Sequence, residues 1–277
     1  MISRRFTPLR IFIFLVLVAG YFTWRLSEKE PTPAAAGTSF NDAGGIPATQ
    51  PIDGLLRVAA YNIDGGVGLK DGRLDLVRTA DALRPYNLIG LEEVHGPSHP
   101  FGDSQAQILA TILKLPWVFA PVERRWGSDA FGNAAMTQLP VTHWQRFPLA
   151  EAAADSNRNV LMLNLIYDGK PLNVIITHLE RHDDHEPELL SVIELFKSLQ
   201  EPAILMGDLN APVADPLIKQ IRSTSGIVDA TGMALSDQHH DTVDWIFARG
   251  LQIVASGFTD NGASDHPLAW ATFHLPQ

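Results

Sequence analysis

The stretch AILMGDLN, residues 203–210, decides the fold of this chain more than any other. Its four apolar residues are followed at once by Gly-Asp-Leu-Asn, a pattern typical of a short buried strand that ends in a turn. Polar groups at the end of a buried strand sit on a rigid mount and can converge with those of neighbouring strands. Taken alone, the pair Asp208 and Asn210 is most often an Asx turn, so its meaning depends on the rest of the chain.

Three further apolar runs end in the same way. RVAAYNI at 57–63 contains Asn62, LIGLEEV at 88–94 contains Glu93, and LNVIITHL at 172–179 contains His178. The remaining helices and strands are predicted from helical spacing and from other apolar runs. The predicted helices are 74–83, 105–115 and 188–199, and the further strands are 133–139, 160–167, 243–248, 251–255 and 268–273. Helices early and strands late favour mixed sheets with helices outside over one doubly wound parallel sheet.

Composition excludes several classes of protein. The chain has 277 residues, of which 45% are hydrophobic and 19% charged, so a disordered or fibrous chain is excluded. It has no cysteine, which excludes disulfide scaffolds, cysteine nucleophiles and zinc-thiolate sites. The net charge of -10 excludes a basic surface that coats phosphate groups. An acidic protein can still act on a phosphate ester when a cation bridges the two.

Residues 1–26 are predicted to be a signal anchor or a signal peptide. Three arginines precede the apolar stretch 11–24, which as a helix would span about 21 Å. A bilayer core is about 30 Å thick, so the stretch is short for a spanning helix and suits a signal-peptide core. The small-residue cleavage candidate, 34–36, lies far beyond the apolar run, which favours an uncleaved anchor. The arginines then predict a membrane-anchored, extracytoplasmic protein, or a secreted one if the segment is cleaved.

Residues 27–53 are rich in Pro, Ala, Gly, Ser and Thr and are predicted to be a flexible linker. The folded domain is then expected at 54–277. Residues 1–53 hold five of the 21 basic and four of the 31 acidic residues, so the domain carries a net charge of -11.

Five short strings in this order resemble the endonuclease/exonuclease/phosphatase superfamily, which includes the DNase I-like nucleases. They are YNI at 61–63, LEEV at 91–94, THL at 177–179, GDLN at 207–210 and SDH at 264–266. Supporting strings are GNA at 132–134 before LPV at 139–141, the strand from Arg158 to Leu165, and TVDWIF at 242–247. The resemblance covers 54–277 and implies an α+β fold, a four-layer α/β/β/α sandwich of two packed mixed β-sheets flanked by helices.

The resemblance also implies metal-assisted attack of water on a phosphate ester, with Mg²⁺ or Mn²⁺ as cofactor. The metal site would be formed by Asn62, Glu93 and Asp265, the catalytic set by His178, Asp208, Asn210, Asp244 and His266, and the phosphate contacts by Arg158 and Asn133. These residue types suit the chemistry, because hard cations take oxygen ligands and histidines titrate near neutrality.

Several roles have alternatives at this level. Asn62 would either ligate the cation or orient Glu93, and Asp208 would orient or deprotonate the attacking water. Asp244 is placed to fix the tautomer of His266. Asp265 has a purely structural alternative as a hydrogen-bond acceptor. An ion pair at the surface is a nearly equal alternative for Arg158.

The sequence departs from the family pattern at three places. Glu92 stands where the usual residue is Gln, Tyr61 where it is Trp, and Thr137-Gln138 where it is Ser-Arg. Two other polar clusters have functional alternatives: a rim or a second cation site for 182–185 (HDDH), and the lining of the substrate entrance for 239–241 (HHD). A solvated loop is favoured for both.

The sequence therefore predicts a divalent-metal-dependent phosphodiesterase, with a nuclease as the first choice. A lipid phosphodiesterase of the sphingomyelinase kind and an inositol-phosphate-type phosphatase are the alternatives, and the acidic charge favours a small or lipid substrate mildly. His178 favours the DNase I and sphingomyelinase branches by resemblance. A catalytically silent binding module is disfavoured because the expected positions are filled. The expected partners are a phosphate-ester substrate and, through the N-terminal segment, a membrane.

Overall fold

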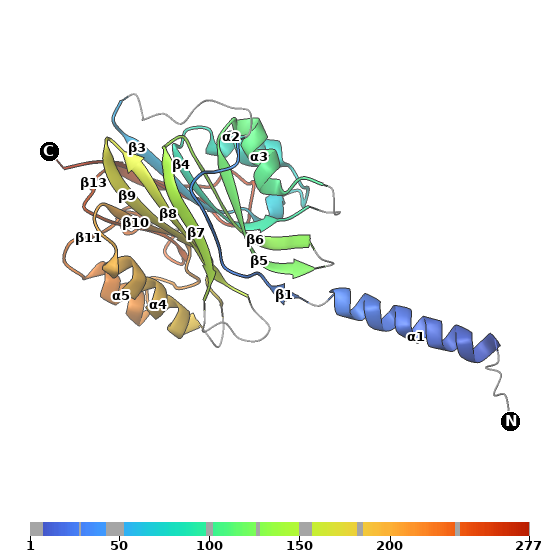
Figure 1. The fold of residues 1–277 in the computed structure, drawn as a ribbon. Coiled ribbons are helices and arrows are strands. Elements are labelled where there is room, and N and C mark those ends of the chain that lie inside the picture. Colours follow the sequence, from blue (N-terminus) through green and yellow to red (C-terminus); the bar gives the residue numbers. More distant parts are fainter. Residues whose placement is uncertain are drawn as a thin grey trace.

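Two seven-stranded β-sheets are stacked face to face, and helices cover both outer faces (Figure 1). The structure is a computed structural model that describes residues 8–27, 29–42, 53–97, 102–125, 128–149, 157–181, 185–235 and 239–276. The first sheet has the order β1 (Glu30–Pro31), β5 (Trp117–Arg125), β6 (Ser128–Thr137), β4 (Leu88–His95), β3 (Leu56–Asn62), β14 (Leu268–His274), β13 (Gln252–Thr259). The second has the order β11 (Ile227–Asp229), β12 (Asp244–Arg249), β10 (Ala203–Asp208), β9 (Lys170–Thr177), β8 (Asn159–Tyr167), β7 (Val141–Pro148), β2 (Ala35–Gly37).

Three apolar interfaces join the four layers. Helices α2 (Leu76–Leu83) and α3 (Gln105–Leu113) pack on the first sheet through one core cluster. Helices α4 (His185–Ser198) and α5 (Pro216–Arg222) pack on the second sheet through another. The third cluster lies between the two sheets. This is the predicted α/β/β/α sandwich, and the prediction is confirmed.

The interior strands are apolar without interruption because both of their faces are buried. In β10, Ile204 and Met206 belong to the cluster between the sheets, while Ala203 and Leu205 belong to the cluster under α4 and α5. Successive side chains of a strand point to opposite faces, so one run supplies two cores. The same alternation holds in β3, where Val58 faces the other sheet.

Helix starts follow local sequence signals. The side chain of Asp75 accepts hydrogen bonds from the backbone at the start of α2, and Ser104 does the same for α3. Asp215 caps α5, where Pro216 follows in the first turn. Helix α5 and strands β5 and β7 were not predicted. The apolar run of β5 is short and has a proline on either side, and the apolar residues of α5 and β7 are separated by polar ones.

The linker prediction is corrected for residues 29–42, which lie on the domain. Strand β1 pairs with β5 at one edge of the first sheet, and β2 pairs with β7 at one edge of the second. Side chains add to this contact, since Trp144 Nε1 donates to the carbonyl of Ser39 at 2.9 Å and Arg146 Nη2 donates to that of Pro33 at 2.8 Å. Edge strands offer unpaired backbone groups, and an extended segment satisfies them without apolar side chains. Composition therefore does not reveal this docking.

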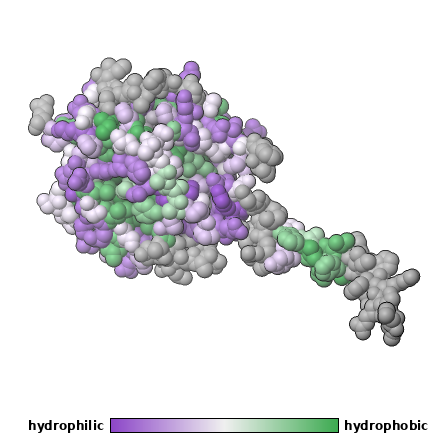
Figure 2. All heavy atoms as spheres, in the orientation of Figure 1, coloured by the Kyte–Doolittle hydropathy of each residue, from purple (hydrophilic) through white to green (hydrophobic). Residues whose placement is uncertain are grey.

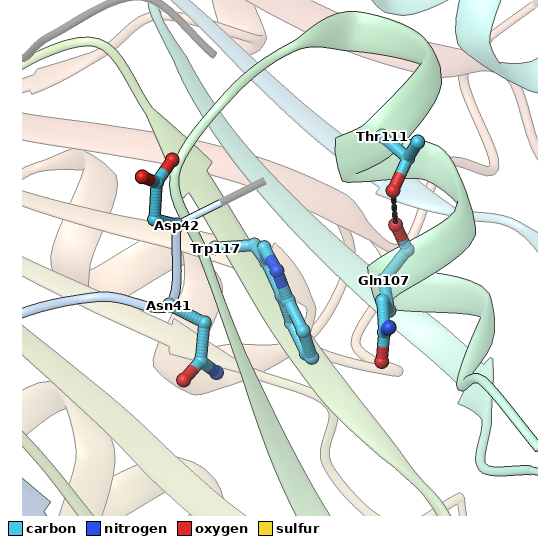
Figure 3. Close-up of a pocket in the computed structure, with 5 residues that line it drawn as sticks. All are labelled: Asn41, Asp42, Gln107, Thr111 and Trp117. Carbon is cyan, nitrogen blue, oxygen red and sulfur yellow. Dashed lines mark hydrogen bonds between the residues drawn. The ribbon is translucent and has the colours of Figure 1, made fainter. Parts of the chain in front are cut away.

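The predicted apolar N-terminal segment forms helix α1 (Pro8–Ser27), which extends away from the sheets (Figure 1). Its apolar side chains form the green surface in Figure 2, and those of Phe14 and Leu17 are 64% and 67% exposed. Within the described ranges, the structure contains no helix that is both long and apolar enough to cross a bilayer. The anchor and the extracytoplasmic location stay predictions, and residues 1–7 lie outside the described part.

Candidate active site

The ends of four strands from both sheets meet at one edge of the sandwich. Strands β3 and β4 run parallel in the first sheet, so Asn62 and Glu93 leave at the same edge. Strands β9 and β10 run parallel in the second, which brings His178 beside Asp208. The turn after β10 needs Gly207, whose φ is 135° and whose added Cβ would lie 2.0 Å from the carbonyl oxygen of Thr177.

A β-bulge in β4 separates the two neighbouring glutamates. Glu92 and Glu93 together oppose the single residue Asn133 of β6, and Glu93 has a positive φ of 56°. Side chains normally alternate along a strand, and a bulge changes which way the extra residue points. As a result, Glu92 is fully buried between the sheets, whereas Glu93 is half-buried at the edge.

Asn62 connects the two sheets at this edge. Its Nδ2 donates to Oε1 of Glu93 and to Oδ2 of Asp208, each at 3.1 Å. Its Oδ1 accepts from the backbone N–H of Asp64 at 3.1 Å. Both ends of the amide are therefore engaged, and Asn62 is hydrogen-bonded to the two carboxylates. Its two predicted roles, ligation of the cation and orientation of Glu93, stay predictions.

Two histidines approach the same carboxylate oxygen. Nε2 of His178 lies 3.5 Å from Oδ2 of Asp208, and Nε2 of His266 lies 3.9 Å from that atom. On its other side, Nδ1 of His266 lies 2.9 Å from Oδ2 of Asp244, a predicted pairing. Asp208 is held by its own turn, because its Oδ1 accepts the backbone N–H of Asn210 at 2.9 Å.

Ser264 holds the segment 264–266 in place at the site. The sequence analysis assigned no role to this residue. Its hydroxyl donates to the carbonyl of Asn62 at 2.7 Å and accepts the backbone N–H of His266 at 3.1 Å. These bonds tie the loop before β14 to the end of β3 and leave Asp265 exposed beside them. The signal was available, since Ser264 directly precedes two predicted site residues.

Burial and charge set the proton affinities of the site. Burial alone would lower the pKa of His266, but the hydrogen bond to Asp244 and the carboxylates of Asp244 and Asp208 raise it to about 9. Burial, with the carboxylate of Asp244, raises the pKa of Asp208 to about 6. Burial, with the positive charge of Arg158, lowers the pKa of His178 well below its usual value. At neutral pH the site therefore holds an ionised Asp208, a protonated His266 and a neutral His178.

Three of the predicted site residues have structural partners. Asn133 is buried, and its Nδ2 donates to Oδ1 of Asn159 at 3.0 Å, within a hydrogen-bond network between the sheets. Arg158 forms an ion pair of 3.3 Å with Glu180, next to His178. The side chain of Asn210 donates to the carbonyl of Leu179 at 2.8 Å. The predicted phosphate contacts of Asn133 and Arg158 stay predictions.

Oxygen donors suited to a hard cation gather at the outer edge of the site. Burial raises the pKa of Asp64, and the carboxylates of Asp265 and Glu93 add to that rise. These three acids are here called the rim acids. Carboxylates that repel one another fit a divalent cation such as Mg²⁺ or Mn²⁺. Asp64 was not predicted, although it follows Asn62 by two positions. Among the described residues, the acids and histidine that do place ligand atoms within 4.8 Å of one another are Asp208, Asp244 and His266.

The two polar clusters predicted to be solvated loops differ in outcome. Residues 182–184 lie outside the described part, and His185 begins α4 with its Nε2 3.0 Å from the carbonyl of Leu209. His240 and Asp241 are exposed as predicted. The prediction was wrong for His239, whose side chain is only 14% exposed and lines a cavity together with His266.

The four-layer sandwich with polar strand ends from both sheets defines a DNase I-like α+β protein. The chain belongs to the endonuclease/exonuclease/phosphatase family, whose model matches residues 59–266. Members of this family are generally phosphoester hydrolases. A comparison with curated proteins gave no match.

Solved structures show the same fold at low sequence identity. An endonuclease/exonuclease/phosphatase from Beutenbergia cavernae is 23% identical, with a TM-score of 0.64 over 80% of this chain and 72% of that chain. The human Nocturnin catalytic domain with a bound sulfate anion is 18% identical, with a TM-score of 0.61 over 82% and 96%. D. rerio TDP2 in complex with a single-strand DNA product is 18% identical, with a TM-score of 0.58 over 80% and 99%.

Proposed function

We propose that this protein is a divalent-metal-dependent phosphodiesterase that cleaves its substrate by attack of water. The observation that carries the proposal is the convergence on Oδ2 of Asp208, which Asn62, His178 and His266 approach at 3.1, 3.5 and 3.9 Å. A carboxylate flanked by two imidazoles, with the rim acids at the same edge, suits proton transfer next to a cation-bound phosphate.

Each part of the site has a role in this proposal. The rim acids would hold Mg²⁺ or Mn²⁺, which would neutralise charge on the phosphate when bound. Asp208, ionised at neutral pH, accepts the proton of the attacking water. The protonated His266 donates a hydrogen bond from Nε2 to a phosphate oxygen, and Asp244 holds its ring. The neutral His178 is placed to contact the phosphate from the second sheet.

Nucleic acid is the first substrate to test. It is supported by family membership and by the likeness to a TDP2 complex that holds a single-strand DNA product. The second candidate is a small or lipid diester, which the net charge of -11 on residues 54–277 supports because long polyanions are repelled by an acidic surface.

The test is hydrolysis of plasmid DNA, bis-p-nitrophenyl phosphate and sphingomyelin by the full chain, with Mg²⁺, with Mn²⁺ and with EDTA. We expect at least one substrate to be cleaved in a metal-dependent manner, and His266→Ala to slow that cleavage at least about a hundredfold, because an oxyanion contact is lost. Equal behaviour of the wild type and the variant on every substrate would refute the assignment. Calorimetry that detects no binding of either cation would instead support a catalytically silent module.

A further inference from the structure

A cavity of about 350 Å³ opens directly beside the catalytic histidine. Its lining includes Asp244, His266 and the rim acid Asp265, here called the near wall, and His239 and Asp260, here called the far wall. The cavity is therefore continuous with the place where the phosphate would bind. Whatever group is esterified to that phosphate on this side must enter the cavity.

The far wall of the cavity is rigid. Nε2 of His239 lies 3.1 Å from Oδ2 of Asp260. The ring of His239 also stacks on Phe258, with centroids 4.8 Å apart and an interplanar angle of 24°. A histidine fixed by a carboxylate is the arrangement that His266 and Asp244 show on the near wall. Two histidine–aspartate pairs therefore line the cavity, and only the pair of His266 and Asp244 has a role in the proposed reaction.

The charge of the wall indicates which groups it accepts. Four carboxylates line the cavity, those of Asp241, Asp244, Asp260 and Asp265, and none of the described residues that line it is Lys or Arg. Oδ1 of Asp244 is buried and has no hydrogen-bond partner among the described residues. A buried acceptor without a donor is costly, so a ligand that supplies a donor is favoured there. A second phosphate would be repelled by these four carboxylates, because the protonated His266 is already engaged by Asp244 and by the phosphate that is cleaved.

We propose that this cavity is the subsite for the esterified group of the substrate and that it selects a group with an ammonium donor over a neutral group, and rejects a group with a second phosphate. This inference rests on the proposed phosphodiesterase function. His239 is the specificity-determining residue of the far wall, and Asp260 is its positioning residue. The subsite thus disfavours internal positions of a nucleic acid, where the next phosphate would fall here.

The test compares three diesters of methyl phosphate that differ only in the second alcohol: 2-aminoethyl, propyl and 2-phosphonooxyethyl. Their hydrolysis by the full chain with Mn²⁺ is followed by phosphorus NMR, so either ester bond can break. We expect kcat/KM to fall in that order, with roughly tenfold between the first two, the size of a hydrogen bond to a charged group. Each variant is compared with the wild type on the same diesters, which cancels the intrinsic reactivities of the esters.

Asp260→Asn and His239→Gln should each reduce the preference for the 2-aminoethyl ester at least about threefold and leave propyl ester hydrolysis much less changed. Asp81→Asn is the matched control, because it removes one exposed carboxylate from α2 that is paired with Arg84. Thermal unfolding shows whether each variant is folded, and the test can be made with either variant if only one of them folds. Any of three results would overturn the subsite. The wild type could hydrolyse the diesters without a preference, the folded variants could keep the preference unchanged, or the phosphorylated ester could be hydrolysed fastest. If none of the three diesters is hydrolysed although plasmid DNA, bis-p-nitrophenyl phosphate or sphingomyelin is cleaved, the subsite is overturned. If none of these six substrates is cleaved, the phosphodiesterase function itself is overturned.

Discussion

The acids of the site fall into two regions that differ in burial. The rim acids, Asp64, Glu93 and Asp265, lie at the open edge, while Glu92, Asp208 and Asp244, here called the buried acids, are 0, 1 and 2% exposed. Carboxylates at an open edge stay hydrated and available to a cation. Buried carboxylates are costly to ionise, so burial raises the pKa of each of the buried acids. In the proposed function, the rim acids would hold the cation, and Asp208 among the buried acids would accept the proton.

The largest expected effect comes from removing a buried acid. Asp208→Asn keeps the hydrogen-bond geometry of the turn but cannot accept a proton from water, so we expect kcat to fall about 10³-fold. If the division holds, Mn²⁺ affinity measured by calorimetry should change little. A variant that lost both turnover and Mn²⁺ binding would show that Asp208 belongs with the cation holders.

Glu93→Gln should give the converse result. We expect Mn²⁺ affinity to fall roughly a hundredfold, because a carboxylate ligand of a hard cation is replaced by a neutral amide. Turnover should then be recovered in large part by raising the Mn²⁺ concentration. Calorimetry and the Mn²⁺ dependence of the rate measure the two quantities separately, and unchanged affinity would remove Glu93 from the metal site.

These distinctions were only partly visible in the sequence. The buried strands and the meeting of their polar ends were predictable from uninterrupted apolar runs that end in polar residues, whereas the four-layer arrangement followed from the resemblance to a known family. The opposite directions of Glu92 and Glu93 were not, because they depend on a bulge that places both opposite Asn133. The position of His239 was hidden for a similar reason, since its burial comes from Phe258 and Asp260, some twenty residues later in the chain.

The pH dependence of turnover sharpens the assignment of the proton carriers. Asp208 must be ionised to accept a proton, so kcat/KM should rise as pH increases through about 6. His266 must be protonated to donate a hydrogen bond, so kcat/KM should fall as pH increases through about 9. Each limb should change about tenfold per pH unit. Asp244→Asn should move the upper limb to lower pH, because the carboxylate that raises the pKa of His266 is lost; an upper limb that stayed in place would contradict the pairing.

The smallest effect on turnover is expected at Glu92. Burial, with the carboxylates of Asp244 and Asp208, raises its pKa well above the ordinary value, which favours the protonated form, and a protonated carboxyl group has the shape and donor of a glutamine amide. We expect Glu92→Gln to change kcat at pH 7 less than about threefold, because the substitution then removes no charge.

Although Glu92→Gln should change kcat little, it should change how the stability of the protein depends on pH. Because the folded-state pKa of Glu92 is raised, its contribution to stability is complete below the unfolded pKa and is lost as pH rises toward the folded pKa. Glutamine does not titrate. The difference between the Tm of Glu92→Gln and the Tm of the wild type should therefore increase in favour of the variant as pH rises above about 4.5. Thermal unfolding between pH 5 and 9 measures the gap. A constant gap across that range would mean that Glu92 is ionised in the folded protein and belongs, in spite of its burial, with the rim acids.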